Sequence, residues 1–158
     1  IHQVIPSKLL LIGDGPDRGR LEKDVRESSF SEDVRFLGKL EAMEEILSIG
    51  DLFLLPSESE SFGLAALEAM ACQVPVISSN TGGIPELNLH GVTGFMSEVG
   101  DVDSMAKNAI HILENEERLT TFKRNALEHA KKFDIHRVMP LYEDLYKRVL
   151  KESQNAVH

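Results

Sequence analysis

The sequence lacks the features of disulfide-stabilised and membrane-spanning proteins. It has a single cysteine, Cys72, which excludes an internal disulfide framework and favours a reducing compartment. No apolar run is long enough to cross a bilayer, and residues 1–6 lack the basic start and apolar core of a signal peptide. We therefore expect a cytoplasmic protein that folds without disulfide bonds.

Positive charge is also scarce. Lysine and arginine number 17 against 26 acidic residues, which gives a net charge of −9. An acidic chain repels nucleic-acid phosphates, so we expect no nucleic-acid partner. The short basic runs Lys131–Lys132 and Lys147–Arg148 fall in helical stretches that also contain glutamate, a pattern typical of solvated helix faces.

Residue groups that bind zinc or act as nucleophiles are missing as well. The six histidines are scattered, and no pair has the spacing of zinc ligands. No Ser/His/Asp or Cys/His arrangement is evident. Cys72 falls near the end of a predicted helix and is interpreted as a small core residue. We expect neither a metal nor a cofactor.

What the sequence does contain is a regular alternation of apolar runs and amphipathic stretches, in a length that suits one domain. The apolar runs predict strands at residues 8–12, 34–37, 51–55, 74–77 and 94–96. The amphipathic stretches predict helices at about 17–29, 41–49, 62–70, 102–114, 116–132 and 134–150. This order predicts an α/β fold, with a Rossmann-like parallel sheet covered by helices on both faces.

In such a sheet, ligands bind beyond the carboxyl ends of the strands. The loops that leave those ends span residues 13–16, 57–63 and 78–85, together with Gly38. We expect them to form one rim.

The strongest motif on that rim is a pair of glutamates, Glu60 and Glu68, with Gly63 between them. The Glu60 carboxylate lies in a loop, where it can accept hydrogen bonds from sugar hydroxyls. Gly63 lacks a Cβ and lets an anion approach the free amides at the start of the next helix. Glu68, about two turns into that helix, can accept both hydroxyls of a ribose. Chance also produces glutamates at this spacing, so the Ser-Phe-Gly insert and the strand–loop–helix context carry the interpretation.

Two other rim features are less specific. The pair Gly82–Gly83 forms either a backbone nest for an anion or a simple tight turn. Leu37–Gly38, at a strand end, can present backbone groups to a flat base.

The segment after the first predicted strand opens like a dinucleotide-binding fingerprint, with Gly13 and Gly15. However, Pro16 follows, and Arg18 stands where the third glycine belongs. A tight turn beside the ligand is therefore the better interpretation.

Taken in order, these motifs resemble the C-terminal half of the glycogen-synthase-like retaining glycosyltransferases, which have the two-domain GT-B fold. The resemblance rests on residues 13–16, 34–38, 60–71, 75–76, 82–86 and 91–94, and it extends from about Lys8 to the end of the last helix. Within that family, residues 60–64 and 67–72 are most similar to a branch that joins N-acetylglucosamine to malate for bacillithiol synthesis.

The resemblance implies a nucleotide-sugar donor, UDP-N-acetylglucosamine, whose sugar is transferred with retention of configuration. Catalysis then depends on stabilising the charge of the departing diphosphate. Glu60 would bind the donor sugar and act in catalysis, and Glu68 would bind the ribose hydroxyls. The remaining contacts would come from groups at Ser61, Phe62, Gly63 and Leu64 for the sugar and diphosphate, at Leu37 and Gly38 for the uracil, and at Gly13 and Gly15 beside them.

The resemblance also implies a missing partner. In the family, an Arg and a Lys that clamp the diphosphate precede the position of Lys8, and an acceptor domain lies N-terminal to them. We therefore expect residues 1–158 to be a nucleotide-sugar-binding C-terminal domain that is inactive by itself. Its last helix would lack part of its normal contact surface, which leaves Leu141, Leu145 and Val149 exposed. Gln73 stands where the family usually has glycine.

Two other interpretations remain open. A doubly wound signalling or binding module shares this sheet pattern, but receiver domains need clustered aspartates at strand ends, and Asp14 and Asp51 do not supply them. A nucleotide-sugar site can also serve regulation rather than catalysis. In that case binding of a UDP-sugar would survive Glu60→Ala.

Overall fold

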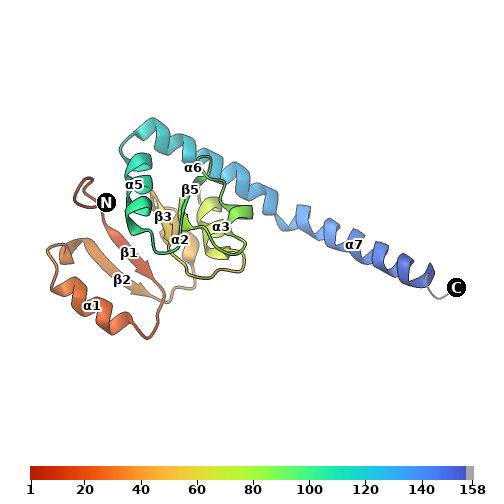
Figure 1. The fold of residues 1–158 in the computed structure, drawn as a ribbon, viewed down its shortest axis with the longest axis horizontal. Coiled ribbons are helices and arrows are strands. Elements are labelled where there is room, and N and C mark those ends of the chain that lie inside the picture. The colour runs from red at the N-terminus through yellow and green to blue at the C-terminus, as the bar shows by residue number, and fades with distance from the viewer. Residues whose placement is uncertain (156–158) are drawn as a thin grey trace.

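The computed structural model describes the backbone of residues 1–155 and the side chains of residues 1–153. Its strands are β1 (Leu9–Ile12), β2 (Val34–Gly38), β3 (Phe53–Leu55), β4 (Val76–Ser79) and β5 (Gly94–Ser97). Its helices are α1 (Arg18–Arg26), α2 (Met43–Leu47), α3 (Leu64–Ala71), α4 (Ile84–Leu87), α5 (Val102–Leu113), α6 (Glu116–Ala130) and α7 (Ile135–Asn155), with short 3-10 turns η1 (Ser31–Asp33) and η2 (Lys131–Phe133). The predicted α/β alternation is confirmed (Figure 1).

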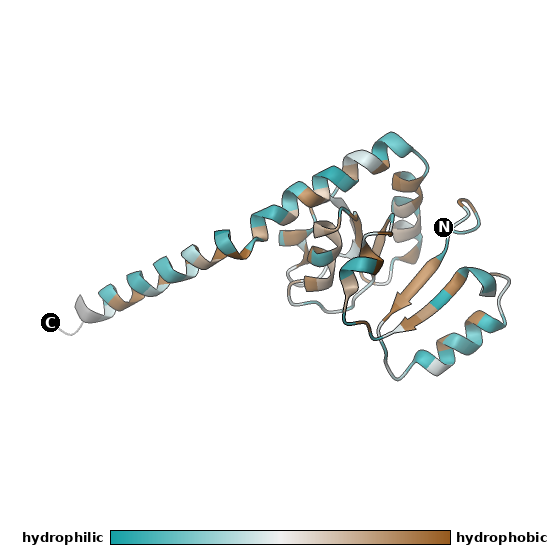
Figure 2. Ribbon diagram, turned by 180° about the vertical axis from the view of Figure 1, so that it is seen from behind, coloured by the Kyte–Doolittle hydropathy of each residue, from teal (hydrophilic) through white to brown (hydrophobic). Residues whose placement is uncertain are grey.

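All strand pairs are parallel, but their hydrogen bonds form two sheets. β1 pairs with β2, and β3, β4 and β5 form a separate sheet in that order. Figures 1 and 2 show β1 on the side of β2 that lies nearer to β3. The alternation of strands and helices predicts parallel pairing, but it cannot tell which strands are immediate neighbours.

The sheet of β3, β4 and β5 has a hydrophobic core on each face, because adjacent residues of a strand point to opposite sides. On one face, Val76 packs with alanines of α3 and α6 and with Leu87 of α4. On the other face, Ile77 packs with α5 and with Phe122 of α6. Helices thus cover both faces of this sheet, as predicted, and Figure 2 shows the hydrophobic residues gathered there.

Two predicted element boundaries shift for local backbone reasons. α3 begins at Leu64 rather than near Phe62, because Gly63 has a left-handed backbone with φ of 93°. β4 begins at Val76 rather than Val74. The Val74 amide donates to the Ala69 carbonyl of α3 (2.9 Å), and Pro75 has no amide to donate.

The end of α3 has a backbone conformation at position 73 that favours glycine. Gln73 has a φ of 64°, and it is the non-glycine residue with positive φ among those described. Its amide donates to the Met70 carbonyl (3.0 Å), so the residue terminates the helix in the conformation that glycine adopts most easily.

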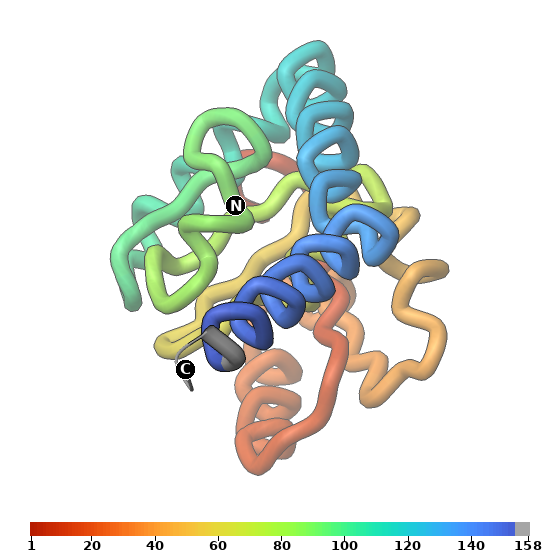
Figure 3. Tube along the Cα trace, turned by 90° about the vertical axis from the view of Figure 1, so that its right-hand side faces the viewer, coloured from red at the N-terminus to blue at the C-terminus, as the bar shows by residue number. Residues whose placement is uncertain are grey.

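α7 extends away from the rest of the molecule (Figures 1 and 3). Asp134 caps it, since its carboxylate accepts from the His136 amide at 2.8 Å. Leu141, Leu145 and Val149 are 69%, 42% and 51% exposed, which confirms that this helix lacks a packing surface here.

Candidate functional site

The loop between β3 and α3, residues 56–63, contains the strongest sequence motif. It ends at Gly63, which is buried and left-handed, and no side chain caps the helix that follows. A Cβ on Gly63 would lie 2.5 Å from the Ile84 side chain, so glycine is required for space as well as for conformation. The first amides of α3 therefore have no acceptor from within the helix or from a cap.

The β3–α3 loop lies directly against the start of α4. The Gly83 amide donates to the Glu60 carbonyl (3.3 Å), and the Thr81 hydroxyl donates to the Glu58 carbonyl (3.2 Å). A Cβ on Gly82 would overlap the Glu60 carbonyl oxygen, and one on Gly83 would overlap the Ser61 carbonyl oxygen. The sequence left open whether this glycine pair forms an anion nest or a tight turn. The structure shows a different requirement for glycine: the backbone of residues 82–83 packs directly against the backbone of the β3–α3 loop.

Glu60 is half-buried, and its Oε1 accepts from the Ser61 amide at 3.1 Å, which fixes the carboxylate within the loop. Ser61 and Leu64 are exposed, whereas Phe62 is half-buried. Ser61 and Leu64 are therefore open to solvent, whereas the side chains of Glu60 and Phe62 lie partly within the protein.

Glu68 is exposed and sits four residues after Leu64, one turn into α3 rather than the predicted two. It lines an open pocket of about 300 Å³ between α2 and α3, whose other walls are Glu41, Met43, Glu44, Leu47, Ala71 and Cys72. Among the described side chains, no hydrogen bond or ion pair engages the Glu68 carboxylate. It is therefore free to accept from a ligand.

Sequence reasoning missed the α2 wall of this pocket. The sequence predicted a helix at residues 41–49, but nothing in it indicated that this helix borders the pocket. The Cys72 thiol points toward the Glu44 carbonyl (3.9 Å). Burial, with smaller contributions from the Glu44 and Glu68 carboxylates, raises the pKa of the Cys72 thiol, which disfavours its reactive thiolate form.

The loops after β1 and β2 are joined to each other. The Gly13 amide donates to the Gly38 carbonyl at 2.8 Å, and the Gly15 amide donates to the Asp14 carboxylate at 2.9 Å. Leu37 and Gly38 are half-buried, while Gly13 and Gly15 are exposed. Arg18 lies over Gly38, where its guanidinium is held by Glu22 (2.8 Å), and this hydrogen bond raises the pKa of Arg18.

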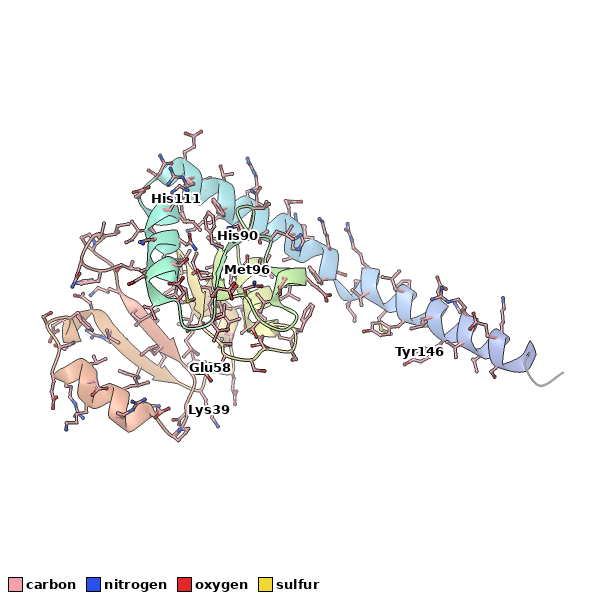
Figure 4. The ribbon with its side chains drawn as sticks, viewed as in Figure 1. Lys39, Glu58, His90, Met96, His111 and Tyr146 are labelled. Carbon is pink, nitrogen blue, oxygen red and sulfur yellow. The ribbon has the colours of Figure 1, made fainter. Side chains whose placement is uncertain are left out.

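In the view of Figure 4, Lys39, directly after Gly38, and Glu58 of the β3–α3 loop lie on the same side of the molecule. No hydrogen bond or ion pair among the described residues joins Gly13, Gly15 or Gly38 to the segment from Glu60 to Glu68. The structure thus places the predicted residues in two separate clusters, one after β1 and β2 and the other at the β3–α3 loop and α3.

Other chemistry is not assembled in the described part of the chain. No group of three or more His, Cys, Asp or Glu side chains is arranged to hold a metal ion there. Asp51 precedes β3 and pairs with Lys123 (2.7 Å), so it belongs to the opposite end of the strand from the rim. No helix in this part has the length and apolar character to cross a membrane.

Residues 2–129 match the family model for "Glycosyl transferases group 1". The chain belongs to this family. It is 42% identical over 153 residues to N-acetyl-alpha-D-glucosaminyl L-malate synthase of Bacillus anthracis, an alignment that covers 96% of this chain and 40% of the relative. The chain thus spans about 40% of the length of that relative.

Solved structures agree with this assignment. Sucrose-phosphate synthase from Thermosynechococcus elongatus superimposes with a TM-score of 0.84 at 29% identity, over 94% of this chain and 40% of the other. The Anabaena protein HepE in complex with UDP superimposes with a TM-score of 0.81 at 27% identity, over 90% of this chain and 42% of the other. The chain therefore has the Rossmann-like fold of one half of the GT-B glycosyltransferases, as expected from its motifs.

Proposed function

We propose that the chain is the C-terminal, nucleotide-sugar-binding domain of a retaining glycosyltransferase whose donor is UDP-N-acetylglucosamine. Family membership supports glycosyl transfer, and the name of the Bacillus anthracis relative supports this sugar and L-malate as the acceptor. The complexes of HepE with UDP and UDP-glucose support a uridine nucleotide. The acceptor would be held by an N-terminal domain of the whole enzyme.

The start of α3 is the observation that carries this proposal. Its first amides have no capping side chain, and Gly63, which precedes them, has no side chain of its own. Such amides, aligned with the helix dipole, favour a bound phosphate. Glu68 is four residues further on the same helix face, about 6 Å along the axis. A diphosphate on the first turn therefore brings the ribose hydroxyls toward the free Glu68 carboxylate.

Glu60 and the backbone from Ser61 to Leu64 would act on the sugar and diphosphate. As the bond between sugar and phosphate breaks, its electron pair leaves with UDP, and the sugar becomes cation-like. The Glu60 carboxylate beside the sugar and the α3 amides beside the diphosphate would stabilise these separating charges. Leu37 and Gly38, with Gly13 and Gly15 behind them, would receive the uracil. This assignment uses no metal and no cofactor.

Calorimetric titration with UDP, UDP-N-acetylglucosamine, ADP and GDP tests the proposal. We expect the chain to bind the two uridine nucleotides and to transfer no sugar by itself. Glu60→Ala should weaken binding of UDP-N-acetylglucosamine more than binding of UDP, because Glu60 would contact the sugar. Equal binding of all nucleoside diphosphates, or of none, would contradict the proposed donor. Equal UDP-N-acetylglucosamine binding by the chain and by Glu60→Ala would favour a regulatory site instead.

A further inference from the structure

The β3–α3 loop is held from two sides. On one side the backbone of Gly82–Gly83 touches the Glu60 and Ser61 carbonyls. On the other side the Phe62 ring meets the edge of the Phe133 ring, with centroids 5.7 Å apart and planes at 65°. Phe133 belongs to η2, between α6 and α7, so a distant part of the sequence reaches the loop.

Phe62 is the large apolar side chain of this loop. Its neighbours Ser57, Glu58, Ser59 and Ser61 are polar. These residues have no apolar surface with which to fix the loop. The orientation of the peptide groups around Phe62, up to left-handed Gly63, therefore depends on where its ring is held.

Phe133 is held firmly in turn. It packs against the core formed by α3, α4 and α6, and its ring meets the edge of His129 at a centroid distance of 5.4 Å. The His129 side chain on α6 is buried, and its ring forms a wall behind Phe133. α6 also packs along α3, through Ala126 and Ala130 against its alanines. The wall behind Phe133 is thus fixed to the helix that the loop leads into.

We propose that Phe133 is a positioning residue for the donor nucleotide. Through the Phe62 ring it fixes the backbone of Ser61–Leu64 in the geometry that receives the diphosphate. This inference rests on the proposed function, in that the donor is a UDP-sugar. Phe133 itself touches no substrate in this scheme.

The test compares Phe133→Leu, Phe133→Tyr and Phe122→Leu with the unaltered chain. Leucine keeps apolar volume at position 133 but loses the ring edge, and tyrosine keeps the ring. Phe122 is also on the C-terminal side of the fold, but it packs in the other core, against Phe95 with centroids 5.4 Å apart. Phe122→Leu is therefore the matched control for general loosening.

Two measurements are needed: amide hydrogen exchange of residues 57–64 without ligand, and the Kd for UDP. We expect Phe133→Leu to speed exchange in this loop and to weaken UDP binding about threefold to tenfold, the range of an aromatic pair. Phe133→Tyr should restore both values, and Phe122→Leu should change neither.

Unchanged loop exchange in Phe133→Leu would overturn the inference whatever UDP does. Faster exchange with an unchanged Kd would overturn it too, as would an equal effect of Phe122→Leu. Failure of the unaltered chain to bind UDP would instead overturn the proposed function and with it the role toward the donor. In that case the exchange data would still report whether Phe133 holds the loop.

Discussion

Replacing Glu68 by glutamine removes one charge and one acceptor from the pocket between α2 and α3. A carboxylate accepts hydrogen bonds at both oxygens, whereas a carboxamide has one acceptor and one donor group. Because the Glu68 side chain is exposed and engages no other described side chain, the change should leave folding nearly unaffected. Its effect on UDP binding therefore reports the ribose contact directly.

The size of the effect follows from one lost hydrogen bond to a charged group. Such a bond contributes about 1.5–3 kcal/mol, so Glu68→Gln should weaken UDP binding roughly tenfold to hundredfold. Removing the Glu68 charge also has a small effect in the opposite direction, because it reduces the repulsion between the diphosphate and the acidic pocket, which Glu41 and Glu44 also line. At an exposed position this gain in binding is less than about 1 kcal/mol.

Calorimetric titration of the chain, Glu68→Gln and Glu44→Gln with UDP and 2′-deoxy-UDP separates these effects. Glu44→Gln makes the same charge change in the same pocket, so it should bind UDP at least as tightly as the unaltered chain. The loss caused by Glu68→Gln should shrink for 2′-deoxy-UDP, since one of its two hydroxyl partners is already absent. Equal affinities of the chain and Glu68→Gln for both nucleotides would leave Glu68 without a role in ribose binding.

Three further outcomes follow from other residues. Saturating UDP should slow alkylation of Cys72, which lines the Glu68 pocket, and equal alkylation rates with and without UDP would place the nucleotide elsewhere. Without UDP, Glu68→Gln should speed alkylation, because one cause of the raised thiol pKa is removed. Gln73→Gly should raise the free energy of unfolding by about 1 kcal/mol in urea denaturation, because glycine adopts the left-handed backbone of this position without strain, whereas Gln73→Ala should not. Burial, then Lys132, lowers the pKa of His129, offset in part by the Glu86 backbone. Below the ordinary value of 6.5 the unfolded chain binds a proton that the folded chain does not, so the free energy of unfolding should fall as pH falls, and His129→Phe should flatten that dependence.

The fold could be predicted because its signals are local. Apolar runs with turn residues after them located β1 to β5 to within about two residues, and Asp134 marked the start of α7. Gly63 was placed correctly at the entry to α3, where its left-handed backbone is one that glycine adopts easily. The separation of β1 and β2 from the other strands left no such signal.

The candidate site was predictable only where its residues are neighbours in the sequence. Glu60, Gly63 and Glu68 belong to one loop and the helix that follows it, so the strand–loop–helix pattern was enough to predict that they lie close together. The α2 wall of the pocket is different, because it depends on how α2 packs across α3, and short-range patterns do not encode that packing.

The contacts that fix the β3–α3 loop show most clearly why the remaining part of the site was not predictable. The glycine pair at 82–83 could be interpreted from sequence as a nest or a turn, since both need the same residues. Only the approach of the Glu60 and Ser61 carbonyls shows why a side chain is excluded there. Phe133 marked merely the end of a helical pattern, yet its ring lies against Phe62. Both contacts are long-range, and both act on the same few peptide groups. A site of this kind is therefore specified in two parts: the chemical groups by a local motif, and their geometry by residues that no local motif identifies.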